Sequence, residues 1–157
     1  MTKTISRLAL IGVVGMASVS SAFAQGQSVL HGKWVRDAAT PAGLHGASPD
    51  GEDVVVEPID VKVTRPGKAL GKVLVPDGVE RVDAINPRKH CRTSWETQRL
   101  VTECRDTGGG PGGGAPPLVT REVRWVDATG AMVVETTWEA GGRPFTVTSK
   151  YRKAEQQ

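Results

Sequence analysis

Apolar and polar residues alternate almost without interruption in the C-terminal part of the chain, between Leu118 and Arg152. A period of two residues is typical of β-strands, because successive side chains point to opposite faces of a sheet. The two interruptions, Asp127–Gly130 and Ala140–Pro144, have the composition of turns. The pattern therefore predicts a three-stranded antiparallel meander with one buried face. That face is expected to carry Val119, Val123, Trp125, Met132, Val134, Thr136, Trp138, Phe145, Val147, Ser149 and Tyr151.

The segment from Cys91 to Cys104 predicts a hairpin that turns at Thr97-Gln98. In one register all cross-strand pairs are compatible, and such pairs stabilise a sheet. The inward pairs are Cys91 with Cys104, Thr93 with Thr102, and Trp95 with Leu100, and the outward pairs are Arg92 with Glu103, Ser94 with Val101, and Glu96 with Arg99. Directly opposed residues have the Cα separation that a disulfide requires, so we expect a Cys91–Cys104 bond. Only the turn departs from the preferred two-residue hairpin sequences.

Shorter strand-like segments fill the N-terminal half. They are Val29–Asp37, Val54–Val56, Ile59–Thr64, Ala69–Val75 and Val79–Ile85, joined by turns at Arg65–Lys68 and Pro76–Gly78. The connection Ala38–Gly51 has no periodicity, and residues 106–117 contain the sequence GGGPGGG. This glycine run leads into prolines and a strand rather than a helix, so we expect a mobile hairpin loop and no phosphate-binding loop. The chain is therefore predicted to be all-β, a small antiparallel up-and-down β-barrel of eight to ten strands with one disulfide.

Residues 1–24 have the three parts of a cleavable signal peptide. Lys3 and Arg7 are basic, a short apolar run follows, and Ala22-Phe23-Ala24 fits a signal peptidase site. We expect cleavage after Ala24, export to the periplasm or the exterior, and a single domain over residues 25–157. The apolar run is too short to span a bilayer, and no cysteine that could carry a lipid lies near the cleavage site. The mature chain is therefore expected to have no membrane anchor.

Charge and cysteine content limit the possible partners. The chain has 20 Lys and Arg residues and 17 Asp and Glu residues. Loss of Lys3 and Arg7 with the leader leaves 18 basic and 17 acidic residues, so the mature chain has no basic footprint for nucleic acid. Two cysteines in an exported chain indicate one disulfide, formed in an oxidising compartment.

Candidate catalytic and metal-binding residues are sparse. His31, His45 and His90 lie far apart and share no metal-ligand spacing, so a structural or surface role is expected for each. The acidic segment Asp50–Asp53 lacks the alternating ligands of a calcium loop. Ser48 has neither a nucleophile elbow nor an orienting His–Asp pair. We therefore expect no catalytic residue, no metal and no cofactor, and a protein that is not an enzyme.

The aromatic residues allow two interpretations. Trp95, Trp125, Trp138, Phe145 and Tyr151 fall on predicted inward faces, and Trp34 lies on the first strand. The favoured interpretation is that they fill the core, because small barrels are packed with side chains. The alternative is an aromatic-lined cavity that holds an apolar ligand.

Arg121 is the anomaly of the C-terminal meander. It shares the predicted buried face with Val119 and Val123, and an unpaired buried charge is too costly to persist. Arg121 is expected to reach water at the barrel mouth, with an acidic partner or the anionic head group of a ligand as alternatives. The candidate ligand-binding residues are therefore Arg121, Trp125, Trp138, Phe145 and Tyr151.

Two features resemble the lipocalin and calycin superfamily. The first is Gly32-Lys33-Trp34 on the first strand, combined with a basic residue at the end of the last strand. The resemblance implies that Trp34 plugs one barrel end and that Arg152 or Lys150 packs across it, in a cation–π contact. The second is the order of Thr93–Glu96, Arg99–Glu103 and the meander, which is similar to lipocalin-like exported bacterial proteins without assigned function. It departs from the family in that its disulfide joins neighbouring strands.

The resemblance implies a fold and, through it, two classes of function. The first is non-catalytic binding of a small apolar or amphiphilic ligand. The second is a protein-interaction module, such as an inhibitor of an envelope or secreted hydrolase, that acts through the loops Ala38–Gly51 and Asp106–Pro117. A cavity of several hundred Å³ favours the first class, and a packed interior with ordered loops favours the second.

Overall fold

The computed structural model describes residues 29–37, 50–68, 71–108, 117–140 and 142–154. These residues form ten β-strands, and none of them belongs to a helix that could cross a membrane. The strands are β1 (Gly32–Arg36), β2 (Gly51–Val56), β3 (Val61–Thr64), β4 (Lys72–Leu74), β5 (Asp77–Val82), β6 (Lys89–Glu96), β7 (Arg99–Asp106), β8 (Leu118–Val126), β9 (Met132–Ala140) and β10 (Arg143–Lys153). All their pairings are antiparallel. The all-β fold predicted from the alternation is confirmed.

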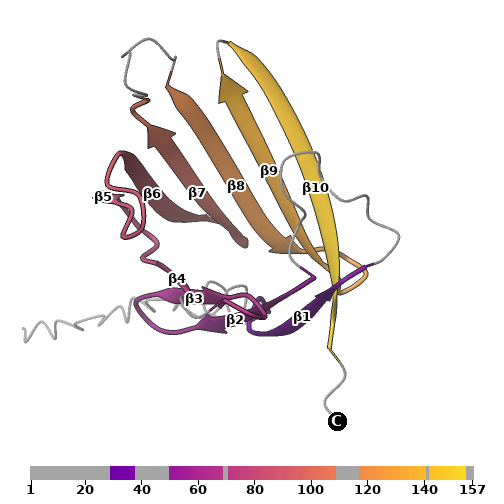
Figure 1. Cartoon of the computed structure of the whole chain (residues 1–157). Helices are drawn as coiled ribbons and strands as arrows, with labels where there is room; N and C mark the ends of the chain where they lie inside the picture. The colour runs from indigo at the N-terminus through magenta and orange to yellow at the C-terminus, as the bar shows by residue number, and fades with distance from the viewer. Residues whose placement is uncertain (1–28, 38–49, 69–70, 109–116, 141, 155–157) are drawn as a thin grey trace, which may run out of the picture.

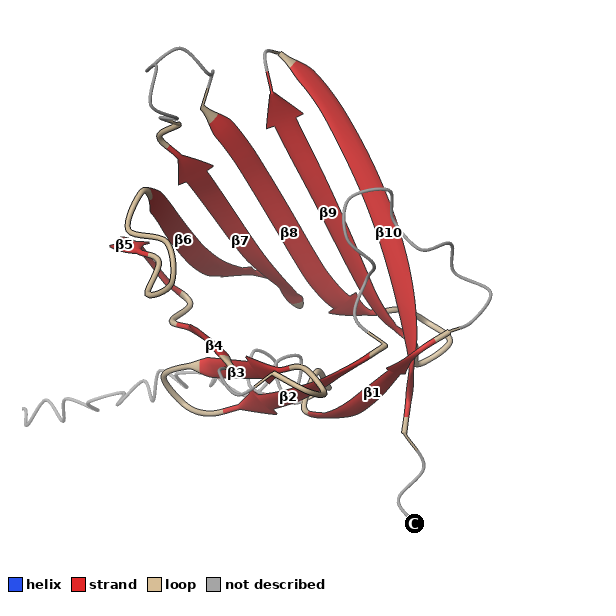
Figure 2. Ribbon diagram, in the orientation of Figure 1, coloured by secondary structure: helices blue, strands red, loops and turns tan. Residues whose placement is uncertain are grey.

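The ten strands form one sheet, in the order β4-β3-β2-β1-β10-β9-β8-β7-β6-β5, which curls into a half-barrel (Figure 1). Each strand pairs with its sequence neighbour, except that β1 pairs with β10 and that β4 and β5 do not pair. We call β1–β4 the floor and β5–β10 the wall. Figure 2 shows the wall strands rising away from the floor, so that the floor covers only one end of the wall.

The hydrophobic core lies where floor and wall meet. Its buried residues are Leu30, Trp34, Val54, Val61, Val63, Leu74, Leu100, Met132, Val134 and Tyr151. They lie on one face of the sheet, because directly paired strand residues share a face. We call this face the inner face. Three buried residues of the opposite, outer face, Val101, Val123 and Val133, are only 2–3% exposed.

Trp34 on β1 is buried in the core. Its indole Nε1 donates a hydrogen bond to the Leu30 carbonyl over 2.9 Å. The basic residue over its ring is Lys153, whose Nζ lies 5.6 Å from the ring centroid. The predictions of Arg152 or Lys150 are wrong for this contact, because Lys153 lies opposite Trp34 in the register whereas Arg152 lies opposite Val35. Gly32 has φ +143°, a backbone conformation that residues with a Cβ rarely adopt, so this position favours glycine.

The β6–β7 hairpin has the predicted register. Every expected pair is present, from Cys91 with Cys104 to Glu96 with Arg99. The disulfide joins Cys91 and Cys104 across a Cα separation of 4.1 Å. The turn has an uncommon sequence for a hairpin. Thr97 adopts φ 58°, a left-handed conformation in which Gly or Asn is usually found.

The predicted face of β8 is wrong. Val126 pairs with Met132, so the inner face of β8 carries Thr120, Glu122, Arg124 and Val126, and the outer face carries Val119, Arg121, Val123 and Trp125. The apolar phase of β8 belongs to a second, smaller cluster on the outer face, where the Arg99 guanidinium lies 4.9 Å from the centroid of the Trp125 ring. On β9 and β10, by contrast, the inner residues from Met132 to Tyr151 follow the predicted phase.

Some predictions concern parts of the chain that lie outside the described residues. These are the signal peptide at residues 1–24, His45, Ser48, the glycine run in the loop 106–117 and most of the connection 38–51.

Candidate binding face on the inner side of the wall

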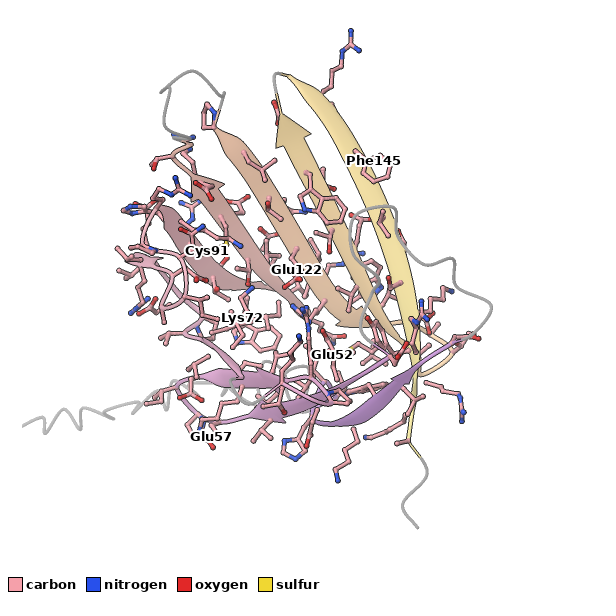
Figure 3. All side chains as sticks on the ribbon, in the orientation of Figure 1. Glu52, Glu57, Lys72, Cys91, Glu122 and Phe145 are labelled. Carbon is pink, nitrogen blue, oxygen red and sulfur yellow. A yellow bond between two sulfur atoms is a disulfide. The ribbon has the colours of Figure 1, made fainter. Side chains whose placement is uncertain are left out.

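Five charged side chains form an alternating chain between floor and wall. Figure 3 labels three of them, Glu52, Glu122 and Lys72. Arg65 Nε lies 3.3 Å from Glu52 Oε1, and Arg124 Nη2 lies 3.2 Å from the same oxygen. Arg124 Nη1 donates a hydrogen bond to Glu122, and Lys72 Nζ lies 3.6 Å from Glu122 Oε1. The Glu52 and Arg124 side chains are 1% and 2% exposed, so the centre of this chain is fully buried. The residues come from the β3–β4 turn, β2, β8 and β4, and they join the floor to the wall.

The burial of these charges shifts their protonation equilibria. Burial by itself lowers the pKa of the Arg124 guanidinium, but Glu122 and Glu52 outweigh this effect and raise it above its usual value. Burial raises the pKa of Glu122, yet Arg124 and Lys72 bring it down to about 2. Burial lowers the pKa of Lys72, and the attraction of Glu122 only partly opposes this shift. Arg124 and Glu122 are therefore both charged at neutral pH, and burial disfavours the charged form of Lys72.

An aromatic pair lies farther along the same face. Trp138 on β9 and Phe145 on β10 are stacked, with ring centroids 6.0 Å apart and an interplanar angle of 26°. Phe145 is 39% exposed, whereas the core aromatic Tyr151 on the same strand is 1% exposed. Figure 3 shows Phe145 on the part of β10 that extends past the floor. The inner face of the wall thus changes from packed core, through the charged chain, to an accessible aromatic surface.

The structure separates the five predicted ligand-binding residues into three groups. Trp138 and Phe145 form the accessible pair. Tyr151 lies in the core, where burial and the Glu52 carboxylate raise its pKa to about 12. Arg121 and Trp125 lie on the outer face, so their predicted inward position is wrong. Arg121 Nη2 lies 3.2 Å from Glu96 Oε2, and its Nε lies 3.5 Å from Glu103 Oε1.

The sequence analysis missed Glu52, Lys72, Glu122 and Arg124. A signal for two of them was present, because Glu122 and Arg124 alternate on β8 in the phase opposite to Val123 and Trp125. To predict that Glu122 and Arg124 face inward, one must know that Arg124 has an acidic partner on β2. That partner, Glu52, is 72 residues from Arg124 in the sequence. No local pattern provides that partner.

A hollow with a volume of about 460 Å³ opens on the outside, at the β6–β7 turn. Its walls are Glu96, Thr97, Gln98, Arg99, Trp125 and Val126. Because the Arg99 guanidinium lies over the Trp125 ring, this hollow presents charged and amide groups rather than a bare aromatic surface.

The histidines of the described residues have separate surroundings. His31 Nδ1 accepts a hydrogen bond from the Val56 amide over 3.2 Å, and His90 Nδ1 lies 3.5 Å from Glu80 Oε1. Within the described ranges, no group of three or more His, Cys, Asp or Glu residues is placed to hold a metal ion.

Comparisons with protein families, with curated proteins and with solved structures find no match to this chain.

Proposed function

We propose that this protein binds a small apolar or amphiphilic molecule on the inner face of the wall, without catalysing a reaction. The observation that carries the proposal is the stacked pair of Trp138 and Phe145, which lies on the inner face but leaves Phe145 39% exposed. Apolar contacts of this size are favourable when a ligand removes them from water. The Gly32–Trp34 segment and the pairing of β1 with β10 also support a lipocalin-like arrangement.

The proposal is tested with N-phenyl-1-naphthylamine, an uncharged aromatic probe whose fluorescence rises in apolar surroundings. The wild-type protein is expected to bind it, and the double variant Trp138→Ala/Phe145→Ala is expected to bind it about tenfold more weakly or not at all. Trp125→Ala is the matched control, because it removes an aromatic ring from the outer face of the same sheet. Equal loss in the control, or no binding by the wild type, contradicts the proposal.

Export is part of the same proposal. The disulfide Cys91–Cys104 is consistent with an oxidising, extracytoplasmic location. The sequence of residues 1–24 adds the pattern of a signal peptide. N-terminal sequencing of protein recovered from the periplasm or the medium is expected to begin at Gln25.

A second candidate function, a protein-interaction module, is supported by the two edges of the sheet, where none of the described residues forms a further strand beside β4 or β5. All six residues of β5 are exposed, and the exposed apolar residues Val73, Val79 and Val82 lie on the two edge strands. Asp83 N donates to Lys89 O over 2.7 Å, so the backbone groups of Val82 point away from β6 toward the free edge. An unpaired edge accepts an extended segment of a partner by strand addition.

Native mass spectrometry of protein purified from its own host distinguishes the two functions. A co-purified mass of a few hundred daltons supports ligand binding, and a co-purified polypeptide supports the interaction module.

A further inference from the structure

We infer that Lys72 binds the anionic head group of an amphiphile whose apolar part lies on Trp138 and Phe145. This inference rests on the proposed function and narrows the ligand class to anionic amphiphiles, such as long-chain carboxylates.

The alternating chain contains unequal numbers of positive and negative side chains. The alternating chain has three cations, Arg65, Arg124 and Lys72, but only two carboxylates, Glu52 and Glu122. Arg124 is fully buried and has both carboxylates as partners. The two terminal cations share their carboxylates with Arg124 and are only partly enclosed, with 47% and 36% of the side chain exposed for Arg65 and Lys72. Within this chain of five side chains the cations outnumber the carboxylates by one, and an anion at either end completes the alternation.

Lys72 lies on the same face of the sheet as the aromatic pair. Lys72 lies opposite Val63, a residue of the core, and so belongs to the inner face, whereas Arg65 lies in the β3–β4 turn. Lys72 reaches Glu122 on β8, and Glu122 pairs with Thr136 on β9. Trp138 follows Thr136 by two residues on the same face, roughly 7 Å farther along the strand. A single amphiphile can therefore place its head group on Lys72 and its apolar chain on the aromatic pair.

The ammonium group of Lys72 is partly removed from water. Burial lowers the pKa of Lys72, and repulsion from Arg124 and Lys89 adds to this shift. Burial removes part of the water around its ammonium group, which forms one ion pair within the described residues, with Glu122 at 3.6 Å. A charge-assisted hydrogen bond is strongest in such a partly dehydrated place.

The test compares decanoate with decanol, which share a ten-carbon chain and differ in the head group, as competitors that displace N-phenyl-1-naphthylamine. The wild-type protein is expected to bind decanoate about tenfold more tightly than decanol. Lys72→Met is expected to abolish this preference while decanol binding stays within about twofold of the wild-type value. Lys72→Arg is expected to restore the preference. Lys62→Met is the control, because Lys62 lies on the neighbouring strand and pairs with Glu57 at the surface over 2.8 Å.

The outcomes separate this inference from the proposed function. Equal binding of decanoate and decanol by the wild type overturns the anionic head group and leaves apolar binding in place. A preference for decanoate that survives in Lys72→Met, or that Lys62→Met removes equally, overturns the role of Lys72. Failure of the probe and both competitors to bind overturns the inference together with the proposed function. Circular dichroism of each variant confirms that the sheet is intact.

Discussion

The β6–β7 hairpin and its neighbour β8 differ in what they place on the inner face of the sheet. On the hairpin, Arg92 and Glu103 face outward and form an exposed ion pair over 2.7 Å, while the inner face carries the disulfide and a hydrogen-bonded threonine pair. On β8, Glu122 and Arg124 face inward, and Val123 and Trp125 face outward. Between Cys91 and Cys104 the inner face of the hairpin is thus uncharged, whereas β8 carries two charged side chains on the same face.

The difference shows how the same residue types acquire different energetic roles. Exposed ion pairs contribute little to stability, because water solvates both charges and side-chain entropy is lost. In a buried ion pair, water cannot replace a missing partner. Removing one of the two side chains therefore leaves an uncompensated charge in the interior. Arg124 connects β8 to β2, so a buried ion pair links the wall to the floor.

The comparison is tested most strongly by removing one arginine from each face of β8. Arg124→Met leaves Glu52 and Glu122 without their shared partner, and is expected to lower the free energy of unfolding by about 3–5 kcal/mol. Arg121→Met removes the same group from the outer face and is expected to cost less than about 1 kcal/mol. Urea denaturation measures both values. Equal losses for the two variants contradict the proposed difference between the faces.

On the hairpin the largest single contribution is expected from the covalent bond. The double variant Cys91→Ala/Cys104→Ala should lose about 3 kcal/mol of unfolding free energy, because the bond closes a short loop in the unfolded chain. The strand register should persist, since five further cross-strand pairs are compatible with it between Arg92 and Arg99. Amide exchange and cross-strand NOEs between Thr93 and Thr102 monitor the register. A shifted register shows instead that the disulfide sets the pairing.

The pH dependence of stability tests the role of the buried charges on β8. The pKa of Glu122 is about 2 in the folded protein, against 4.5 as its usual value, so its contribution is present above about pH 5 and is lost as pH falls toward 2. The loss attributable to Glu122 is about 2 kcal/mol at pH 3. Thermal unfolding of the wild type and of Glu122→Gln between pH 7 and pH 3 measures it, and the variant should depend less on pH. Parallel curves for both proteins indicate that Glu122 has no lowered pKa.

The sequence predicts the two parts of the wall with unequal success for a physical reason. In the hairpin, each inward residue is tested by a partner nearby in the chain, so the register of Cys91, Thr93 and Trp95 follows from local complementarity. In β8 the local pattern is ambiguous, because Val123 and Trp125 form an apolar cluster on the outer face while Arg124 depends on Glu52, which is distant in sequence. Accordingly, the aromatic pair on β9 and β10 was predicted, and the charged part of the candidate site was not.

The half-closed form of the sheet also lies beyond the sequence pattern. Alternation predicts strands, and strands that follow one another in the sequence pair in eight of the nine cases. The exception is the step from β4 to β5, where only Val75 and Pro76 separate the strands. Proline lacks an amide donor and fixes φ, so the chain leaves β4 without forming a hairpin. The open side of the barrel thus begins at a residue that the sequence analysis had assigned to an ordinary turn.

The smallest expected effect concerns the outer cluster of β8, and it tests whether that face is stabilised by packing or by charge. Arg99→Met keeps an apolar stem over Trp125 but removes the guanidinium that lies 4.9 Å from the ring centroid. Its loss should be about 0.5–1 kcal/mol, the usual contribution of an exposed cation–π contact. Arg105→Met, on the same face of β7 and opposite Val119, is the control with no described ring contact, and its unfolding free energy should remain within about 0.5 kcal/mol of wild type. If both variants have wild-type stability, the charge of Arg99 contributes nothing to its contact with Trp125, and the outer face of β8 is purely a packing surface.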